Sequence, residues 1–339
     1  MQQRDTIIPD IHGDEQGLLD SLERARCIEP HKKGKPLNIT TEGNVILLGD
    51  LNDRGPDDLG VNDRILELMN LLGDRLIAIA GNHEILKYRA LRSGNAEHLA
   101  RWLNEGGMTV LRSIAKRANL LLSHPAHSPF PADISYLPDN LSKDIRVRWN
   151  KQLRRRSAER YDFPAALELA KELFNGPYQT ILERMKIVHE VRSNVWAVHA
   201  GIDAECAQRG PDALNAMFAE SKERGLATFN AHHPLNPIIW MRQRNGRLLS
   251  DETSRILEKH GVDVLIRGHQ HQWRPTLERQ RNISVLHADV AISRSMCKKR
   301  RNNWAYAEFN GDDLFVDSNT GGLHQLGYND GDKFVASAT

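Results

Sequence analysis

The chain has 339 residues, 40% of them hydrophobic and 27% charged, which is sufficient for one large core and an additional subdomain. Its 46 basic and 44 acidic residues leave a formal net charge of +2, which requires neither a nucleic acid nor an anionic membrane as partner. The polar N-terminus lacks the apolar stretch of a signal peptide, and no window approaches roughly 18 consecutive apolar residues. The three cysteines have no metal-binding spacing. We therefore expect a cytoplasmic protein with free thiols and no membrane association.

Strand and helix patterns alternate through the first 95 residues of the chain. The expected strands are at 7–8, 45–48 and 76–80, and the expected helices are at 14–25, at 58–72 and from about Glu84 onward. Such alternation is typical of an α/β sheet.

Residues 90–190 break this rhythm and are predicted to be mostly helical, as an insertion or cap within one domain, 1–330. Helices are expected at 164–174, which begins with a proline, and at 178–188, whose apolar residues recur at helical spacing. The pattern of 305–316 predicts a hairpin that turns at Asn310-Gly311, and the polar tail 331–339 is expected to be disordered.

Five strand-like runs each end in residues that can bind a metal ion. Their motifs are PDIHG, GDLNDRG, GNHE, HAG and RGHQH, which contain Asp10, His12, Asp50, Asn82, His199 and His269. Ligand sites in open α/β sheets gather beyond the carboxyl ends of strands, so we expect these side chains to meet. Oxygen and nitrogen donors without thiolates suit Mn²⁺, Fe or Zn²⁺. These ligands are sufficient for two ions that share the Asp50 carboxylate, roughly 3.5–4 Å apart.

The residues beside these ligands point to hydrolysis of a phosphoester. A water between two dications loses a proton readily and can attack phosphorus in line with the leaving group. Arg54 can neutralise phosphoryl oxygens, and His83 can protonate the leaving alkoxide. Asp53 can orient the His83 imidazole, and no covalent intermediate is required.

The five motifs resemble those of the metallophosphoesterase superfamily and, within it, the phosphoprotein phosphatase (PPP) family of Ser/Thr phosphatases. The family pattern is GDxHG, GDxxDRG, GNHE and HAG, followed by a histidine in RAHQ or GHxx. The resemblance implies an α/β fold with a β-sandwich core flanked by helices and a helical cap, in a single catalytic domain. Residues 102–113 are also similar to a W-NGG-T-S segment of several bacterial members.

The resemblance also implies a role for each matching residue. Asp10, His12 and Asp50 would hold one metal, and Asp50, Asn82, His199 and His269 would hold the other. The phosphate of the substrate would contact Arg54, Arg242 and Asn82, and His83 with Asp53 would form the acid pair. We expect two divalent ions, preferably Mn²⁺, with Fe or Zn²⁺ as alternatives.

The chain departs from the family pattern at several positions. Pro9 stands where a glycine is usual, and Asn52 replaces a usual apolar residue. The late SAPNY segment of the eukaryotic enzymes is replaced by residues 286–293, which points to a bacterial-type branch. The second phosphate-binding arginine is assigned to Arg242, with Arg244 as its rival.

His271 gives the RGHQH motif a second histidine, as in the GHxH of phosphodiesterases and nucleases, where this residue joins the first metal. It is either such a ligand or a solvated loop histidine. The basic runs at 146–160 and 298–301 are either solvated faces or a rim that attracts phosphorylated substrates.

Four functions remain open from the sequence. The first is a phosphomonoesterase of the Ser/Thr phosphatase type, which acts on phosphorylated protein or small phosphoesters. The others are a symmetrical diadenosine tetraphosphate hydrolase, a phosphodiesterase or nuclease, and a metal-binding scaffold without catalysis. A nucleic-acid partner is not expected, and the sequence leaves the natural substrate and the oligomeric state open.

Overall fold

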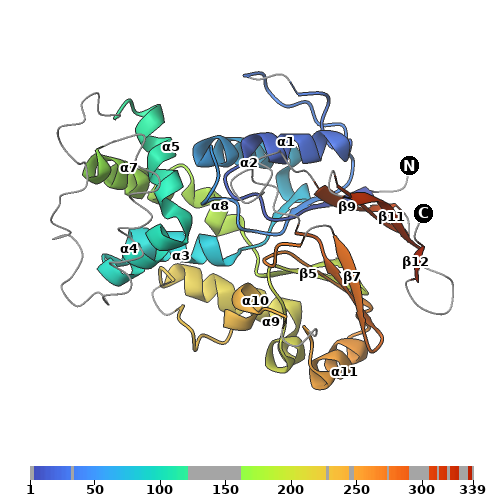
Figure 1. The fold of residues 1–339 in the computed structure, drawn as a ribbon. Coiled ribbons are helices and arrows are strands. Elements are labelled where there is room, and N and C mark those ends of the chain that lie inside the picture. The colour runs from blue at the N-terminus through green and yellow to red at the C-terminus, as the bar shows by residue number, and fades with distance from the viewer. Residues whose placement is uncertain are drawn as a thin grey trace.

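The structure is a computed structural model in which two β-sheets pack against each other and helices cover their outer faces (Figure 1). It describes residues 4–31, 34–120, 162–226, 229–243, 248–272, 275–289, 305–310, 313–318, 321–327 and 335–337. The basic runs at 146–160 and 298–301 lie outside these residues.

The first sheet joins the two ends of the chain. It is a 7-stranded sheet in the order β12-β11-β10-β9-β1-β2-β3. Its strands are β1 (Arg4–Ile8), β2 (Val45–Leu47), β3 (Leu76–Ala78), β9 (Ala305–Asn310), β10 (Asp313–Ser318), β11 (Gly321–Gly327) and β12 (Val335–Ser337). β1, β2 and β3 are parallel, whereas β9 pairs with β1 in the antiparallel sense.

The second sheet is built from the later part of the chain. It is a 5-stranded sheet in the order β4-β5-β6-β8-β7. Its strands are β4 (Val188–Arg192), β5 (Val195–Val198), β6 (Val264–Arg267), β7 (Thr276–Gln280) and β8 (Ile283–His287). β5, β6 and β8 are parallel, so their carboxyl ends lie at one edge of the sheet.

Alternation along the strands divides the apolar side chains between two cores. Ile7, Ile46 and Ile77 of the first sheet meet Val264 and Ile266 of the second in the core between the sheets. Their sequence neighbours on the strands point outward into a second core that the helices cover. This is the sandwich that the family resemblance predicts, and the predicted α/β class is confirmed.

The helices form layers on either side of the sandwich and a group at its end (Figure 1). The elements around the first sheet are α1 (Glu15–Arg24), α2 (Asp58–Leu72) and the 3-10 turn η1 (Gly73–Arg75). Those around the second sheet are α9 (Ala204–Glu223), α10 (Asn236–Trp240) and α11 (Asp251–Lys259). The end group contains α3 (Asn82–Ser93), α4 (Ala96–Trp102), the π-helical turn η2 (Leu103–Gly107), α5 (Met108–Arg117), α7 (Phe163–Asn175) and α8 (Gln179–Arg184).

Several predicted elements match the structure. The helix predicted at 58–72 is α2, and its start is capped by the Asp57 side chain, which accepts from Gly60 N. The predicted hairpin corresponds to β9 and β10, which pair in the antiparallel sense with Asn310 opposite Asp313, and Gly311 of the predicted turn lies outside the described residues. The described part of 90–190 is mostly helical up to Arg184, as predicted.

The helix predicted at 178–188 ends early. α8 stops at Arg184, and Lys186 N then donates to Ala78 O before the chain enters β4 at Val188. Tertiary pairing with the first sheet therefore overrides the helical periodicity of these residues. Lys222 of α9 donates to the carbonyl oxygens of residues 182, 183 and 185, which caps this helix end.

A short strand also lies within the tail that we expected to be disordered. β12 (Val335–Ser337) pairs with β11 at the edge of the first sheet. Within the residues that the structure describes, no helix is both long and apolar enough to cross a membrane.

Candidate metal centre and active site

The predicted ligands come together where the parallel strands end. Three groups of side chains have ligand atoms within 4.8 Å of one another: Asp10 with His12 and His271, His12 with Asp50 and His83, and Asp50 with His199 and His269. All of these residues except His271 are buried. The sequence prediction of one shared cluster therefore agrees with the observed placement.

Asp50 lies between two imidazoles. Its Oδ2 is 3.6 Å from His12 Nε2, and its Oδ1 is 3.4 Å from His199 Nε2. The side chain is 3% exposed, and its Oδ1 also accepts from His83 N at the N-terminus of α3. A carboxylate whose two oxygens face opposite groups of ligands is suited to bridge two cations.

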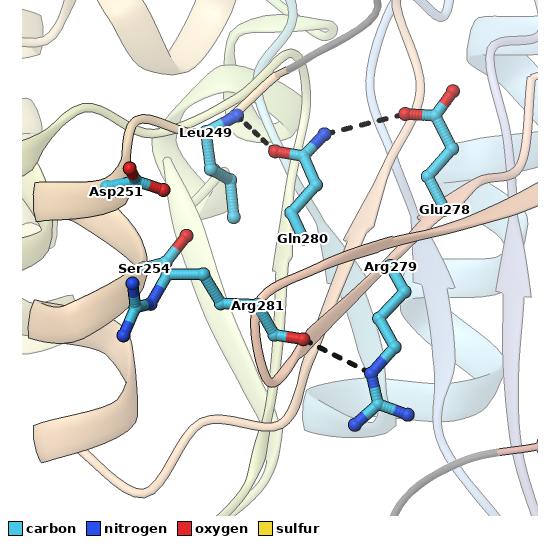
Figure 2. Close-up of a pocket in the computed structure, with 7 residues that line it drawn as sticks. All are labelled: Leu249, Asp251, Ser254, Glu278, Arg279, Gln280 and Arg281. Carbon is cyan, nitrogen blue, oxygen red and sulfur yellow. Dashed lines mark hydrogen bonds between the residues drawn. The ribbon is translucent and has the colours of Figure 1, made fainter.

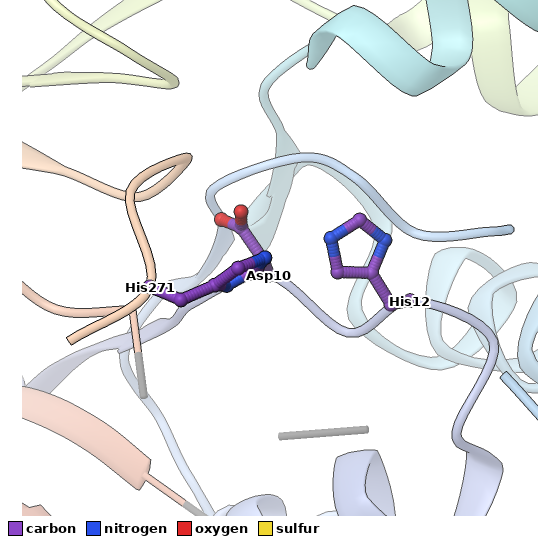
Figure 3. A group of neighbouring side chains, drawn as sticks. All are labelled: Asp10, His12 and His271. Carbon is purple, nitrogen blue, oxygen red and sulfur yellow. The ribbon is translucent and has the colours of Figure 1, made fainter. Parts of the chain in front are cut away.

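The first half of the site contains Asp10, His12 and His271 (Figure 3). His12 donates from Nδ1 to Asn52 O at 3.3 Å, which leaves its Nε2 lone pair for a cation. The Oδ1 of Asp10 is buried without a hydrogen-bond partner among the described residues, while its Oδ2 accepts from His269 N at 2.9 Å. A buried carboxylate oxygen of this kind is what a bound cation would satisfy.

The second half of the site is a convergence of acceptor atoms. His199 donates from Nδ1 to Leu48 O at 2.8 Å, so its Nε2 faces the other ligands. This Nε2 is 3.1 Å from Asn82 Oδ1 and 3.2 Å from His269 Nδ1. These three polar atoms converge in a buried space, and nitrogen and oxygen atoms of this kind fit a divalent metal.

The loops that carry these ligands are held in conformations that most residues avoid. Five site residues have positive φ angles: His12 at 48°, Asp50 at 47°, Asp53 at 71°, Arg54 at 73° and His269 at 65°. Non-glycine residues in this region are strained, and such strain gathers at functional sites. Glycine is also required for steric reasons at two positions. A β-carbon at Gly81 would collide with Asp50, and one at Gly268 would collide with Asp10.

Glu84 holds two of the loops together. Its buried carboxylate accepts from Asp50 N at 2.8 Å, Leu51 N at 2.9 Å and Gly81 N at 2.9 Å. The GNHE motif predicts roles for Asn82 and His83 but none for Glu84. Its function is visible only in the fold, because its partners come from the ends of β2 and β3.

His83 and Asp53 form the expected pair. His83 Nδ1 is 2.7 Å from Asp53 Oδ2, and both side chains are buried. The opposite ring nitrogen, Nε2, is 3.9 Å from Asp50 Oδ2 and has no hydrogen-bond partner among the described residues. Trp102 donates its indole N–H to both oxygens of Asp53, at 3.0 and 3.2 Å. The end group of helices therefore helps to orient this pair, through Trp102 of α4.

The two candidate phosphate-binding arginines lie on different segments. Arg54 is 3.3 Å from His12 through Nη1 and donates from Nε to Glu105 O at 3.1 Å. Arg242 is exposed, and its charge is one of the influences that lower the pKa of His269. Its neighbour Gln243 donates from the backbone to Gln270 Oε1 at 3.1 Å. Arg244 lies outside the described residues.

The electrostatics separate the roles of the histidines. Burial lowers the pKa of His269 to about 2 and lowers that of His12 as well, so both imidazoles are neutral and can bind a cation. Burial opposes protonation of His83 too, but Asp50 and the hydrogen bond to Asp53 raise its pKa above the usual value. A raised pKa keeps more of His83 protonated near neutral pH, which is what a general acid needs. Burial also opposes protonation of His199, but the carboxylates of Asp50 and Asp10 raise its pKa to about 10, and a cation at its Nε2 would displace that proton.

A buried carboxylate lies beside His271. Its Nδ1 is 2.5 Å from Asp289 Oδ2, and Asp289 is fully buried, whereas the His271 side chain is 28% exposed. Asp289 follows β8, at the same edge of the sheet as the other ligands. This pairing resembles the carboxylate–histidine arrangement that orients metal ligands.

A separate pocket of about 360 Å³ lies away from this cluster, between β7 and the start of α11 (Figure 2). It contains charges of both signs and is lined by Leu249, Asp251, Ser254, Glu278, Arg279, Gln280 and Arg281. Gln280 accepts from Leu249 N at 2.6 Å, and Glu278 accepts from Gln243. The pocket walls therefore anchor the segment that carries Arg242.

The comparisons with known proteins agree with this geometry. The family model of the calcineurin-like phosphoesterase matches residues 6–273, so the chain belongs to that family. The predicted membership of the metallophosphoesterase superfamily is confirmed. The family depends on two divalent metal ions, and together with the ligand clusters this makes the chain a metal-dependent phosphoester hydrolase.

A solved structure shares the fold at low sequence identity. The cold-active protein-tyrosine phosphatase of a psychrophilic Shewanella species matches with a TM-score of 0.57 and 19% identity, over 96% of this chain and 81% of that chain. A protein serine/threonine phosphatase from Saccharomyces cerevisiae matches with a TM-score of 0.48 and 12% identity, over 93% and 79% of the two chains. No curated protein matches the sequence.

Binding of Mn²⁺ to chelator-treated protein should stabilise the fold, because the ligands exist as a cluster only in the folded chain. For one site, we expect the free energy of unfolding to increase by about 2.7 kcal/mol when the free Mn²⁺ concentration is about 100 times the Kd. Thermal unfolding and calorimetric titration measure the gain and the stoichiometry. Asp50→Asn should weaken both sites, whereas Asp63→Asn, at a half-exposed position outside the cluster, should weaken neither. Equal Mn²⁺ binding by Asp50→Asn and the unmodified protein would contradict the shared role of Asp50.

Proposed function

We propose that this protein hydrolyses phosphomonoesters, with phosphoserine and phosphothreonine as the model substrates and Mn²⁺ as the preferred metal. The proposal is carried by the His83–Asp53 pair, because its free Nε2 lies 3.9 Å from the carboxylate that both halves of the site share. Cleavage of an alkyl phosphate releases an alkoxide, and a leaving group of this kind needs a proton donor at such a position.

The ligands are assigned in two groups. Asp10, His12 and Asp50 would hold one ion, and Asp50, Asn82, His199 and His269 would hold the other. Two divalent ions, when bound, supply a nucleophile from water at neutral pH and neutralise the phosphoryl oxygens.

The protein residues would perform the other tasks. Asp53 and Trp102 keep the His83 ring in one orientation, so that its Nε2 can deliver a proton to the leaving oxygen. Arg54 has an Nη1 beside His12 and would turn this group toward a phosphoryl oxygen when substrate is present. Arg242 lies just after α10 and would contact the phosphoryl group together with Arg54. Two arginines suit a terminal phosphoryl group, which has several free oxygens.

His83→Asn should lower kcat for a phosphoserine peptide by about two orders of magnitude or more, because the leaving alkoxide loses its acid. The loss should be smaller for p-nitrophenyl phosphate, whose leaving group needs less protonation. Steady-state kinetics with Mn²⁺-loaded protein and metal analysis of each variant measure this difference.

His189→Asn is the matched control, since His189 lies on β4 and belongs to none of the ligand groups. Equal losses on both substrates would remove the acid role of His83. If the unmodified protein holds both metals and cleaves neither substrate, the proposed function is wrong.

A second candidate activity is symmetrical hydrolysis of diadenosine tetraphosphate, and the position of Trp240 favours it. The Trp240 ring centroid is 5.9 Å from that of His269, and the guanidinium of Arg101 lies 5.2 Å from the Trp240 centroid. The indole is partly exposed. An aromatic surface beside the metal ligands can stack against a nucleobase.

We expect phosphoserine peptides to have a higher kcat/KM than diadenosine tetraphosphate, because the acid pair suits an alkoxide leaving group. Product analysis by anion-exchange chromatography decides the question, since symmetrical cleavage releases two ADP. Trp240→Leu should raise KM for the dinucleotide and leave the peptide reaction within about threefold if the indole stacks on a base. A higher kcat/KM for release of two ADP than for peptide cleavage would make the dinucleotide the principal substrate.

A third candidate activity, cleavage of phosphodiesters, rests on His271. This residue belongs to one ligand group with Asp10 and His12, and its Nδ1 lies 2.5 Å from Asp289 Oδ2. We propose that His271 is a further ligand of the first ion.

His271→Ala should weaken Mn²⁺ binding at one site and lower the cleavage of bis-p-nitrophenyl phosphate more than that of p-nitrophenyl phosphate. Asp289→Asn should reproduce part of both effects, about 10- to 100-fold in metal affinity, because it removes the carboxylate that orients the ring. Calorimetry and parallel kinetics measure them. Unchanged Mn²⁺ affinity in His271→Ala would identify His271 as a loop histidine without a ligand role.

A further inference from the structure

Lys87 is a buried lysine behind the metal centre that the proposed mechanism does not use. It lies on α3, three residues after Glu84, and is only 2% exposed. Its Nζ donates to Asn52 Oδ1, across 35 residues of sequence. Burial of a lysine is costly unless its charge is compensated, so its surroundings require an explanation.

The surroundings of Lys87 are acidic on one side and aromatic on the other. The carboxylates of Glu84, Asp53, Asp58 and Asp50 attract its ammonium group. On the other side, the Phe174 ring of α7 lies with its centroid 4.4 Å from Nζ. Lys87 therefore connects the helical cap with the loop that follows β2.

Asn52 links Lys87 to the ligands. It is 1% exposed, and its side-chain Nδ2 donates to Asp58 O at 3.1 Å. Its backbone carbonyl accepts from His12 Nδ1 at 3.3 Å, which is the contact that directs Nε2 of His12 into the metal centre. Asp53, the partner of His83, is the next residue along the chain. The position of Asn52 thus affects a metal ligand on one side and the acid pair on the other.

We propose that Lys87 and Asn52 form one positioning unit for the metal centre. The unit acts through the loop that carries Asn52 and Asp53, and it orients the His12 imidazole for the cation. The inference rests on the proposed two-metal site, but its main readout is metal affinity, which is independent of substrate.

We expect the metal centre to tolerate replacement of Lys87 and Asn52 better when both are replaced than when only one is. Asn52→Val alone leaves the Lys87 ammonium without its neutral acceptor. Lys87→Met alone leaves the side-chain oxygen of Asn52, Oδ1, without its donor and removes the cation among the carboxylates. Each is more harmful than removing both partners, since a buried group that loses its partner keeps its full desolvation cost. The double variant, with valine and methionine, restores an apolar contact at these positions.

The test is a double-variant cycle with Mn²⁺ affinity as the first readout. We expect Asn52→Val and Lys87→Met each to weaken Mn²⁺ binding by about 10- to 100-fold, the range found for groups that orient metal ligands. The double variant should bind Mn²⁺ more tightly than either single variant, because it leaves neither Asn52 Oδ1 nor Lys87 Nζ unpaired, although the cation among the carboxylates is still lost. In the Mn²⁺-loaded proteins, kcat for p-nitrophenyl phosphate should be lower in each single variant than in the double variant. KM should change by less than about threefold in all three.

Lys222→Met is the matched control. Lys222 is partly buried, and its Nζ donates to carbonyl oxygens at the end of α8, remote from the ligands. Its replacement should lower the unfolding temperature without changing Mn²⁺ affinity. This separates loss of stability from loss of positioning.

The proposal is overturned if Lys87→Met and Asn52→Val bind Mn²⁺ as the unmodified protein does, even if both are less stable. It is also overturned if the double variant binds no better than the single variants. Should Lys87→Met fail to fold, a folded double variant with restored affinity supports the proposal, and an unfolded one contradicts it. If the unmodified protein binds two Mn²⁺ ions and cleaves no phosphoester, the proposed function fails while the affinity cycle still tests Lys87 and Asn52.

Discussion

The carboxylate of Asp50 is the constraint on which the rest of the site depends. Its two oxygens lie 3.6 Å from His12 Nε2 and 3.4 Å from His199 Nε2, so one residue belongs to both halves of the centre. A buried charge in this position requires compensation, which the histidines supply in part and two cations would complete. The strained backbone at Asp50 and the Glu84 contacts to its loop are consequences of holding this carboxylate in one place.

The sandwich explains how ligands so distant in sequence meet. Parallel strands β1, β2 and β3 end at one edge of the first sheet, and β5, β6 and β8 end at one edge of the second. Packing the sheets face to face brings these edges together, and the helical cap then covers the acid pair through Trp102. Substrate choice depends on the segments around the metal centre. The fold therefore defines the type of reaction more closely than it defines the substrate.

The sequence predicted what depends on local pattern and on short motifs. The helix predicted at 58–72 is α2, and the six residues predicted as ligands lie in one cluster because each follows a buried strand. The end of α8 could not be predicted, since pairing of Lys186 with Ala78 overrides its helical spacing. The contacts from Lys87 to Asn52 and from Asp289 to His271 were also missed, because they join residues on separate elements through side-chain packing alone.

Anomalous X-ray diffraction from crystals of the Mn²⁺-loaded protein tests the central claim most directly. The account predicts two anomalous peaks roughly 3.5–4 Å apart, one on each side of the Asp50 carboxylate. One peak should lie beside Asp10 and His12, and the other beside Asn82, His199 and His269. A single peak, or two peaks that Asp50 does not separate, would contradict the account.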